Sequence, residues 1–418
     1  MRKENKHMKK RILASLLSLC LILGLLPTAA LAVDEGGGTP AMSGTCGATD
    51  TDSVSWALTD DDEDGNYTLN ISGSGAMADY DNPTSTKEDA VKAPWYTALT
   101  ANETSYLVPI TKIVIDDQIT GLGNYAFAYT SVTTAEFVSN VTDYGDSLYS
   151  HCTEMTTVDW NNFNPKNISD GYVTERADTK GSFIPFSMFD YCSKLNTCKN
   201  GETNCEEGKL VFPSNVTGVM TAAFRGTAFS SIDFESSNVT CGGPYVFSYM
   251  ANLKSLTLPG KVEFYQQDNN GQSSAFESCG LESVTVESTV TAISPRMFDR
   301  CAALSTVTVQ ENSKFKTIGT NAFSGCTSLT SIRIPEKMQN LPNNLFYNCT
   351  SLTSVILPQV VNHIGSYCFY GCSSLTDITL TDCVTHIEEY AFYKCSSLTS
   401  LTLQECTTAI GDYAFAYC

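Results

Sequence analysis

The chain has 418 residues, of which 25 are Lys or Arg and 45 are Asp or Glu, so its formal net charge is −20. This acidic balance argues against nucleic acid and anionic lipid surfaces as partners, because both are bound through patches of Lys and Arg. It favours a well-solvated surface and, more weakly, basic partners or divalent cations.

The first 32 residues have the three parts of a secretory signal peptide. Lys9-Lys10-Arg11 is a basic start, residues 12–26 carry no charge, and Ala30-Leu31-Ala32 matches a small-residue cleavage site. We therefore expect cleavage after Ala32, a secreted or cell-surface protein, and no membrane insertion of the remainder. That remainder has 25 − 6 = 19 basic and 45 − 1 = 44 acidic residues, a net charge of −25.

Two short regions precede the main body of the chain. Residues 33–45 are rich in Gly and polar residues, which is typical of a flexible linker. Residues 46–109 predict a small β-rich module, because alternating apolar stretches flank the turn dipeptide Asp64-Gly65. We interpret this module as an N-terminal cap. The acidic run at 60–64 begins like an EF-hand loop, but Ile71 stands where the bidentate Glu is required, so we assign no calcium there.

Residues 110–418 are repetitive. Near the end, Phe recurs every 23 residues and a Cys follows each Phe at the third position, as in Phe323 with Cys326 and Phe346 with Cys349. A fixed period in the twenties is typical of a solenoid. An apolar-x-x-apolar-x-apolar motif recurs and predicts 12 strands, the last at Leu398/Leu401/Leu403. We expect an α/β-type solenoid of about 12 coils with a parallel β-sheet along one face.

The end of the sequence falls inside a repeat. Cys418 closes the last Phe-Cys unit with no capping segment and no cell-wall anchor after it. We interpret the sequence as truncated in mid-repeat, and we expect the last coil to fray because its core would lack a cover.

Most of the 17 cysteines follow the repeat, so we interpret them as small buried hydrophobic residues rather than disulfide partners. A zinc site would require C-x₂-C pairs with paired histidines, and this pattern is absent. Cys198 and Cys205 do not occupy the repeated cysteine position. They lie on either side of a Gly-containing turn, and they are our candidate disulfide. Cys383 and Cys406 are 23 residues apart and should lie in adjacent coils, where free thiols are favoured.

The unit I-G-x-x-A-F-x-x-C-x-S-L-T-x-I-x-L-P resembles the BspA-like class of leucine-rich repeats. The resemblance covers residues 110–418 and is strongest from Ile318 onward, as in IGTNAFSGCTSLTSIRIP. It implies a secreted or surface protein, typically bacterial, that acts in adhesion or protein binding.

No catalytic constellation is evident. His363 and His386 are one period apart and should stack, but no third metal ligand accompanies them. His151 adjoins Cys152, whose thiol should face the core rather than a cleft. An open sheet also offers no water-excluding pocket for acid–base chemistry. We therefore predict neither an enzyme nor a cofactor.

The outer surface of the repeats is predicted to be a binding surface. The outward strand positions carry acids in the early coils and hydroxyls later, and tyrosines flank many of the repeat phenylalanines. The candidate binding face consists of Glu136, Asp159, Asp233, Thr257, Thr285, Thr308 and Arg333. Its expected partner is an extracellular protein or glycan. Two alternatives stay open, namely the targeting region of a larger secreted enzyme and a structural surface spacer.

Overall fold

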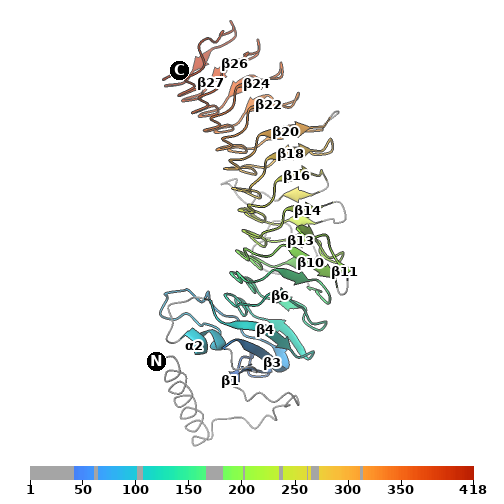
Figure 1. The fold of residues 1–418 in the computed structure, drawn as a ribbon. Helices are drawn as coiled ribbons and strands as arrows, with labels where there is room; N and C mark the ends of the chain where they lie inside the picture. Colours follow the sequence, from blue (N-terminus) through green and yellow to red (C-terminus); the bar gives the residue numbers. More distant parts are fainter. Residues whose placement is uncertain are drawn as a thin grey trace, which may run out of the picture.

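The computed structural model describes residues 42–60, 65–100, 107–165, 182–200, 203–234, 239–260, 262–264, 273–310 and 314–418. Successive repeats stack along one axis, with the N-terminal module at one end and the last repeats at the other (Figure 1). The predicted signal peptide, most of the linker and the acidic run at 61–64 lie outside the described residues.

The N-terminal module is an antiparallel sheet of β1 (Met42–Thr45), β2 (Ser53–Thr59) and β3 (Tyr67–Ala76). The predicted hairpin is therefore confirmed as β2 and β3. Met42–Thr45, the last four residues of the predicted linker, form β1 and pair with the edge of β2. Within the described residues the only helix is α2 (Pro94–Thr100).

The antiparallel module continues directly into the repeats. β3 pairs in parallel with β4 (Ile110–Ile115) and with β5 (Ile119–Leu122). Trp95 of α2 is fully buried at this junction, where its indole N–H donates to the carbonyl oxygen of Ala126 at 2.9 Å. Its ring centroid lies 6.4 Å from that of Phe127, the first repeat phenylalanine.

Each repeat contributes strands to two separate rows of parallel strands, and Figure 1 labels members of both. The strand-face row, which carries the predicted binding residues, contains β4, β6 (Thr134–Ala135), β8 (Thr157–Asp159), β10 (Thr197–Asn200), β12 (Lys209–Val211), β14 (Ser231–Asp233), β16 (Ser255–Leu258), β18 (Ser283–Val286), β20 (Thr306–Val309), β22 (Ser331–Arg333), β24 (Ser354–Ile356) and β26 (Asp377–Ile378).

The second row contains β5, β7 (Asp143–Tyr144), β9 (Phe183–Ile184), β13 (Gly218–Val219), β15 (Thr240–Cys241), β17 (Glu263–Phe264), β19 (Ala292–Ile293), β21 (Thr317–Ile318), β23 (Asn340–Leu341), β25 (His363–Ile364), β27 (His386–Ile387) and β28 (Ala409–Ile410).

These rows correct the predicted architecture in two ways. The expected single sheet along one face is joined by a second row, because the Ile of the I-G position also pairs from repeat to repeat, as in Ile364 with Ile387. The expected α/β character is wrong, since the described repeats consist of short strands and turns with no helix.

Two further strand assignments differ from expectation. The insertion after Leu195 forms an extra hairpin of β10 and β11 (Thr203–Asn204), so β10 pairs with β8 and β12 pairs with β14. The predicted strand at Leu398/Leu401/Leu403 is not formed. Its neighbour β26 has only two residues and pairs with β24, and Leu403 is 44% exposed.

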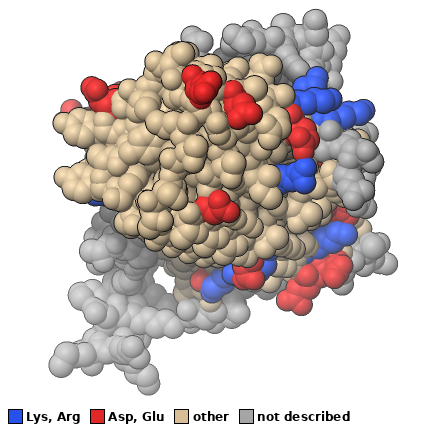
Figure 2. Space-filling model, turned by 90° about the horizontal axis from the view of Figure 1, so that it is seen from above, with Lys and Arg blue, Asp and Glu red and all other residues tan. Residues whose placement is uncertain are grey.

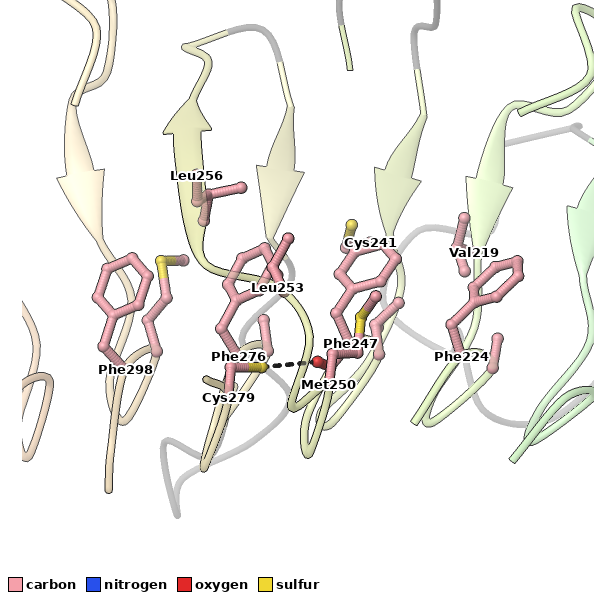
Figure 3. Packing of buried hydrophobic residues seen from close by; sticks show 14 of the residues in the cluster. Val219, Phe224, Cys241, Phe247, Met250, Leu253, Leu256, Phe276, Cys279 and Phe298 are labelled. Atoms are coloured by element: carbon pink, nitrogen blue, oxygen red, sulfur yellow. Dashed lines mark hydrogen bonds between the residues drawn. The ribbon is translucent and has the colours of Figure 1, made fainter. Parts of the chain in front are cut away.

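The core is organised around one column of stacked rings. Neighbouring centroids lie between 5.0 and 6.1 Å apart along the whole series. Figure 3 shows four members, Phe224, Phe247, Phe276 and Phe298, side by side between the strands and the turns. The column is Phe127, Tyr149, Phe189, Phe224, Phe247, Phe276, Phe298, Phe323, Phe346, Phe369, Phe392 and Phe415. Because every ring covers its neighbour, each repeat is stabilised mainly by the next one.

The repeat cysteines lie beside this column as free thiols, and all of them except the exposed Cys418 are buried, as predicted. Each thiol donates to the backbone carbonyl of an aromatic residue in the preceding repeat. Figure 3 shows this bond between Cys279 and Phe247, with Sγ and O 3.0 Å apart. Burial raises the pKa of Cys301 to about 12, so this thiol stays protonated and keeps its hydrogen available for the bond.

Turns on the side away from the strand face also connect the repeats. Tyr390, Phe392 and Lys394 donate their backbone N–H groups to the next repeat at 3.0, 2.7 and 2.9 Å. Tyr390 and Lys394 have φ of 55° and 59°, in the left-handed region that bulky residues rarely adopt. These inter-repeat bonds offset the backbone strain of the turn.

Candidate functional site

The strand-face row places most of the predicted binding residues in one outward column. Thr257, Thr285 and Thr308 are directly paired across β16, β18 and β20. Asp159 pairs with Lys199 in the preceding sheet. Alternation along each strand turns these side chains outward while their apolar neighbours enter the core, as the buried Leu256 and Leu258 illustrate.

The predicted residues do not form one continuous site, because the strand-face row is divided into separate sheets. Glu136 follows β6 and is exposed, and Asp159 lies in the same sheet. Arg333 lies in a later sheet, where it pairs with Glu336 and points to solvent. Only Asp233 and Thr257 line the same hollow of the surface.

That hollow, here called the strand-face cavity, measures about 310 Å³. It lies where the ladder is interrupted. β12 pairs with β14 and β16 pairs with β18, but within the described residues no ladder joins β14 to β16. The lining residues are Lys209, Ser231, Ile232, Asp233, Phe234, Ser255, Leu256, Thr257, Pro259 and Glu287.

Charges are distributed unevenly around the strand-face cavity. Lys209 and Asp233 form an ion pair with Nζ and Oδ2 3.0 Å apart, and the Asp233 side chain is only 17% exposed. Glu287 is held by two hydrogen bonds to Oε2, from the Gly260 N–H at 3.3 Å and from the Thr289 hydroxyl at 3.4 Å. Hydroxyls and charges thus converge over a lining that is more polar than apolar.

Sequence reasoning did not place Lys209, Ser231, Ser255 or Glu287 in the candidate site. Glu287 carries the outward-acid signal, but it follows β18 rather than lying within it. Lys209 precedes Asp233 by 24 residues, close to one repeat, and this spacing is the signal that would have found the ion pair.

The predicted disulfide between Cys198 and Cys205 is not formed. The two residues lie at opposite positions of the β10–β11 hairpin, and the Cys205 N–H donates to the Cys198 carbonyl at 3.1 Å. Both thiols are free, because Cys198 is fully buried in the core whereas Cys205 remains partly exposed. Cys383 and Cys406 are likewise free.

The histidines lie where the sequence predicts them. His363 and His386 are paired across β25 and β27, and their ring centroids are 6.0 Å apart. Glu388 approaches His363, with Oε1 and Nε2 3.5 Å apart. Among the described residues no group of three or more metal-ligating side chains is present. His151 instead stacks on Tyr129 at 4.6 Å, next to the buried Cys152.

A second surface feature is formed by tyrosines on the turns. Tyr367, Tyr390 and Tyr413 stack with centroids 4.9 and 5.2 Å apart. Tyr347, Tyr370 and Tyr393 form a parallel column at 4.8 and 4.9 Å. Because the rings cover one another, these columns present ring edges and hydroxyl groups rather than open faces. The end of the molecule in Figure 2 carries only scattered charged side chains.

The repeat geometry agrees with a comparison to protein families. The model of the BspA type leucine rich repeat region matches residues 101–196, 183–305 and 301–418. The chain therefore belongs to the BspA-type leucine-rich repeat family. A search of curated proteins finds no match.

Solved structures of similar architecture come from bacteria. A leucine-rich repeat protein from Eubacterium ventriosum is 18% identical with a TM-score of 0.52, over 90% of this chain and 95% of that one. One from Bacteroides ovatus is 20% identical with a TM-score of 0.47, over 87% and 91%. A leucine rich cell surface protein from Faecalibacterium prausnitzii is 18% identical with a TM-score of 0.34, over 86% and 94%. The first of these supports the fold. Among the described residues, no helix has the length and apolarity needed to cross a membrane.

Proposed function

We propose that this protein is a secreted or cell-surface solenoid that binds an extracellular macromolecule through its strand face. The observation that carries the proposal is the strand-face cavity, where Asp233 and Thr257 of the predicted face meet Lys209 and Glu287. The signal-like residues 1–32 support export, although they lie outside the described residues. The function is recognition rather than catalysis.

The architecture supports binding by many shallow contacts. Outward hydroxyls and acids follow one another along the strand-face row, as Thr257, Thr285 and Thr308 do. Solenoids expose such extended surfaces because each repeat contacts only its neighbours and leaves its outer side free. Affinity would then accumulate along the row and be concentrated at the strand-face cavity.

The N-terminal module acts in this proposal as the cap of the solenoid. Its β3 pairs with the first strands of both rows, and Trp95 covers the first ring of the aromatic column. A cap is required because the first repeat would otherwise expose apolar surface and unpaired strand edges.

An array of extracellular proteins and glycans tests the proposal. The purified chain is compared with the triple variant Glu136→Lys, Asp159→Lys and Asp233→Lys, which reverses the acidic part of the face. We expect the parent to bind and the variant to lose that binding at least tenfold. A matched triple on exposed acids in or just after second-row strands, Asp143→Lys, Glu389→Lys and Asp412→Lys, should bind normally. Unchanged binding of the strand-face variant to every partner would refute the proposal.

A further inference from the structure

The strand-face cavity has an excess of negative charge next to hydroxyl groups. Its lining contains one basic residue, Lys209, and two acids, Asp233 and Glu287, so its formal charge is 1 − 2 = −1. The ion pair between Lys209 and Asp233 neutralises one wall. The charge that remains is that of Glu287 on the opposite side of the β14–β16 break.

Glu287 is positioned before any ligand arrives. Two hydrogen bonds hold its side chain, one from backbone at Gly260 and one from the Thr289 hydroxyl. Both fall on Oε2, which favours a ligand that binds a carboxylate through a single oxygen. An ammonium group is such a compact charge, whereas a guanidinium prefers to engage both oxygens.

The size of the strand-face cavity limits the ligand to a small group. At about 310 Å³ it is at the lower end of the range for small-molecule sites, which begins at roughly 300 Å³. One long amino-acid side chain fits within such a space. The hydroxyls of Ser255 and Thr257, which are exposed, can accept hydrogen bonds from a second or third ammonium proton.

The rest of the chain favours a polypeptide with basic residues as the source of this group. The formal charge of −20 attracts a cationic partner over a distance. Further acids, Glu136 and Asp159, lie along the same strand-face row and can meet other basic residues of an extended segment. A neutral glycan could bond the hydroxyls and the carboxylate but would leave the negative charge of Glu287 uncompensated.

We propose that the strand-face cavity receives the ammonium group of a lysine side chain from a basic polypeptide, with Glu287 as its charge partner. This inference rests on the proposed binding function of the strand face and specifies the chemistry of its ligand. Lys209 and Asp233 form the opposite wall as an ion pair, so Glu287 carries the uncompensated charge.

Calorimetric titration with pentalysine and with the same peptide acetylated on every side-chain nitrogen tests the charge requirement. Acetylation keeps the backbone and length but removes the ammonium groups. We expect the parent protein to bind pentalysine at least tenfold more tightly than the acetylated peptide. Equal affinity for the two peptides would overturn the inference.

Two substitutions locate the site. Glu287→Gln should weaken pentalysine binding about tenfold. Glu282→Gln is the matched control, because Glu282 is an exposed acid of the same repeat that pairs with Lys254 outside the cavity. It should change affinity less than twofold, and an equal loss in both variants would show that only net charge matters and would refute the inference.

A third substitution, Thr257→Lys, should also abolish binding, because it places an ammonium group in the cavity. Thermal unfolding confirms that each variant is folded.

A neutral oligosaccharide separates this inference from the proposed function. If array-selected neutral glycans bind through the strand face and Glu287→Gln has no effect on any ligand, the lysine inference fails while the binding function stands. If no polypeptide or glycan binds and the strand-face triple variant changes nothing, the proposed function itself fails.

Discussion

The thiol of Cys349 donates a hydrogen bond to the backbone carbonyl of Phe323 in the preceding repeat, with Sγ and O 3.1 Å apart. The same carbonyl also accepts the N–H of Cys326 in its own repeat at 3.2 Å. In two early repeats a threonine takes the place of the cysteine, and Thr227 donates instead to the carbonyl of Phe224 in its own repeat at 2.9 Å. The position is thus filled by a buried residue that in most repeats has a hydrogen to donate, with Met250 as an exception.

This relationship predicts different effects for two substitutions of the same shape. Cys349→Thr keeps a donor, which by analogy with Thr227 would bond the Phe346 carbonyl of its own repeat, whereas Cys349→Val removes the donor altogether. We expect the Thr variant to be more stable than the Val variant by about 1 kcal/mol. Denaturant unfolding of both variants measures the difference. The reverse order of stability would show that packing alone selects cysteine.

Thiol reactivity should follow burial rather than position in the sequence. Burial raises the pKa of Cys301 and Cys395 to about 12, so at pH 8 only about one molecule in ten thousand carries the thiolate. Cys383 is exposed and should be alkylated first by iodoacetamide. Mass spectrometry of the native protein over time measures the order. Modification of Cys301 as fast as Cys383 would contradict the burial of the repeat cysteines.

Asp299 should make the protein less stable as the pH rises. Its side chain is 2% exposed, and burial raises its pKa above the ordinary value of 3.8 despite Arg296 and Arg300 nearby. The stability that the neutral acid contributes is present below that ordinary value and is lost as the pH rises through the raised pKa. Asp299→Asn should therefore raise the thermal midpoint at pH 7 and change it little at pH 3.5.

The control for this experiment is Asp143→Asn, an exposed acid of β7. It should leave the thermal midpoint nearly unchanged at both pH values. If Asp299→Asn lowers the midpoint at pH 7, the ion pairs with the arginines outweigh the cost of burial.

Trp95→Ala should destabilise the junction between the N-terminal module and the repeats. The substitution removes the ring contact with Phe127 and the hydrogen bond to Ala126, and large-to-small changes of this kind cost about 3–5 kcal/mol. Hydrogen exchange should accelerate most in β4 and β5 and much less beyond β18. A uniform acceleration along the chain would show that the repeats unfold as one cooperative unit.

The sequence contained enough information for the repeat, since the period of 23 and the apolar motif predicted the strand-face row and the buried thiols. It did not reveal the second row, because pairs such as Ile364 with Ile387 depend on how the coil closes in space. The disulfide predicted between Cys198 and Cys205 is not formed, and cysteine spacing alone does not show that Cys198 enters the core.

The candidate site was predictable only in part. Alternation predicted Asp233 and Thr257 on the outer surface, and both residues line the strand-face cavity. The cavity itself comes from an interruption between β14 and β16, and the apolar motif is intact in both strands. The point at which strand pairing is interrupted depends on backbone geometry over several repeats. The residue types in one short stretch of sequence do not determine that point.

The constant register of the last repeats has a consequence for how such a surface changes in length. From Phe323 to Phe415 each ring, thiol and strand position recurs after 23 residues and meets its own kind in the next coil. Loss or duplication of one whole unit in the coding sequence would therefore rejoin every column in the same register. The length of the stacked repeats can therefore change by whole repeats, while the chemistry of each repeat stays the same.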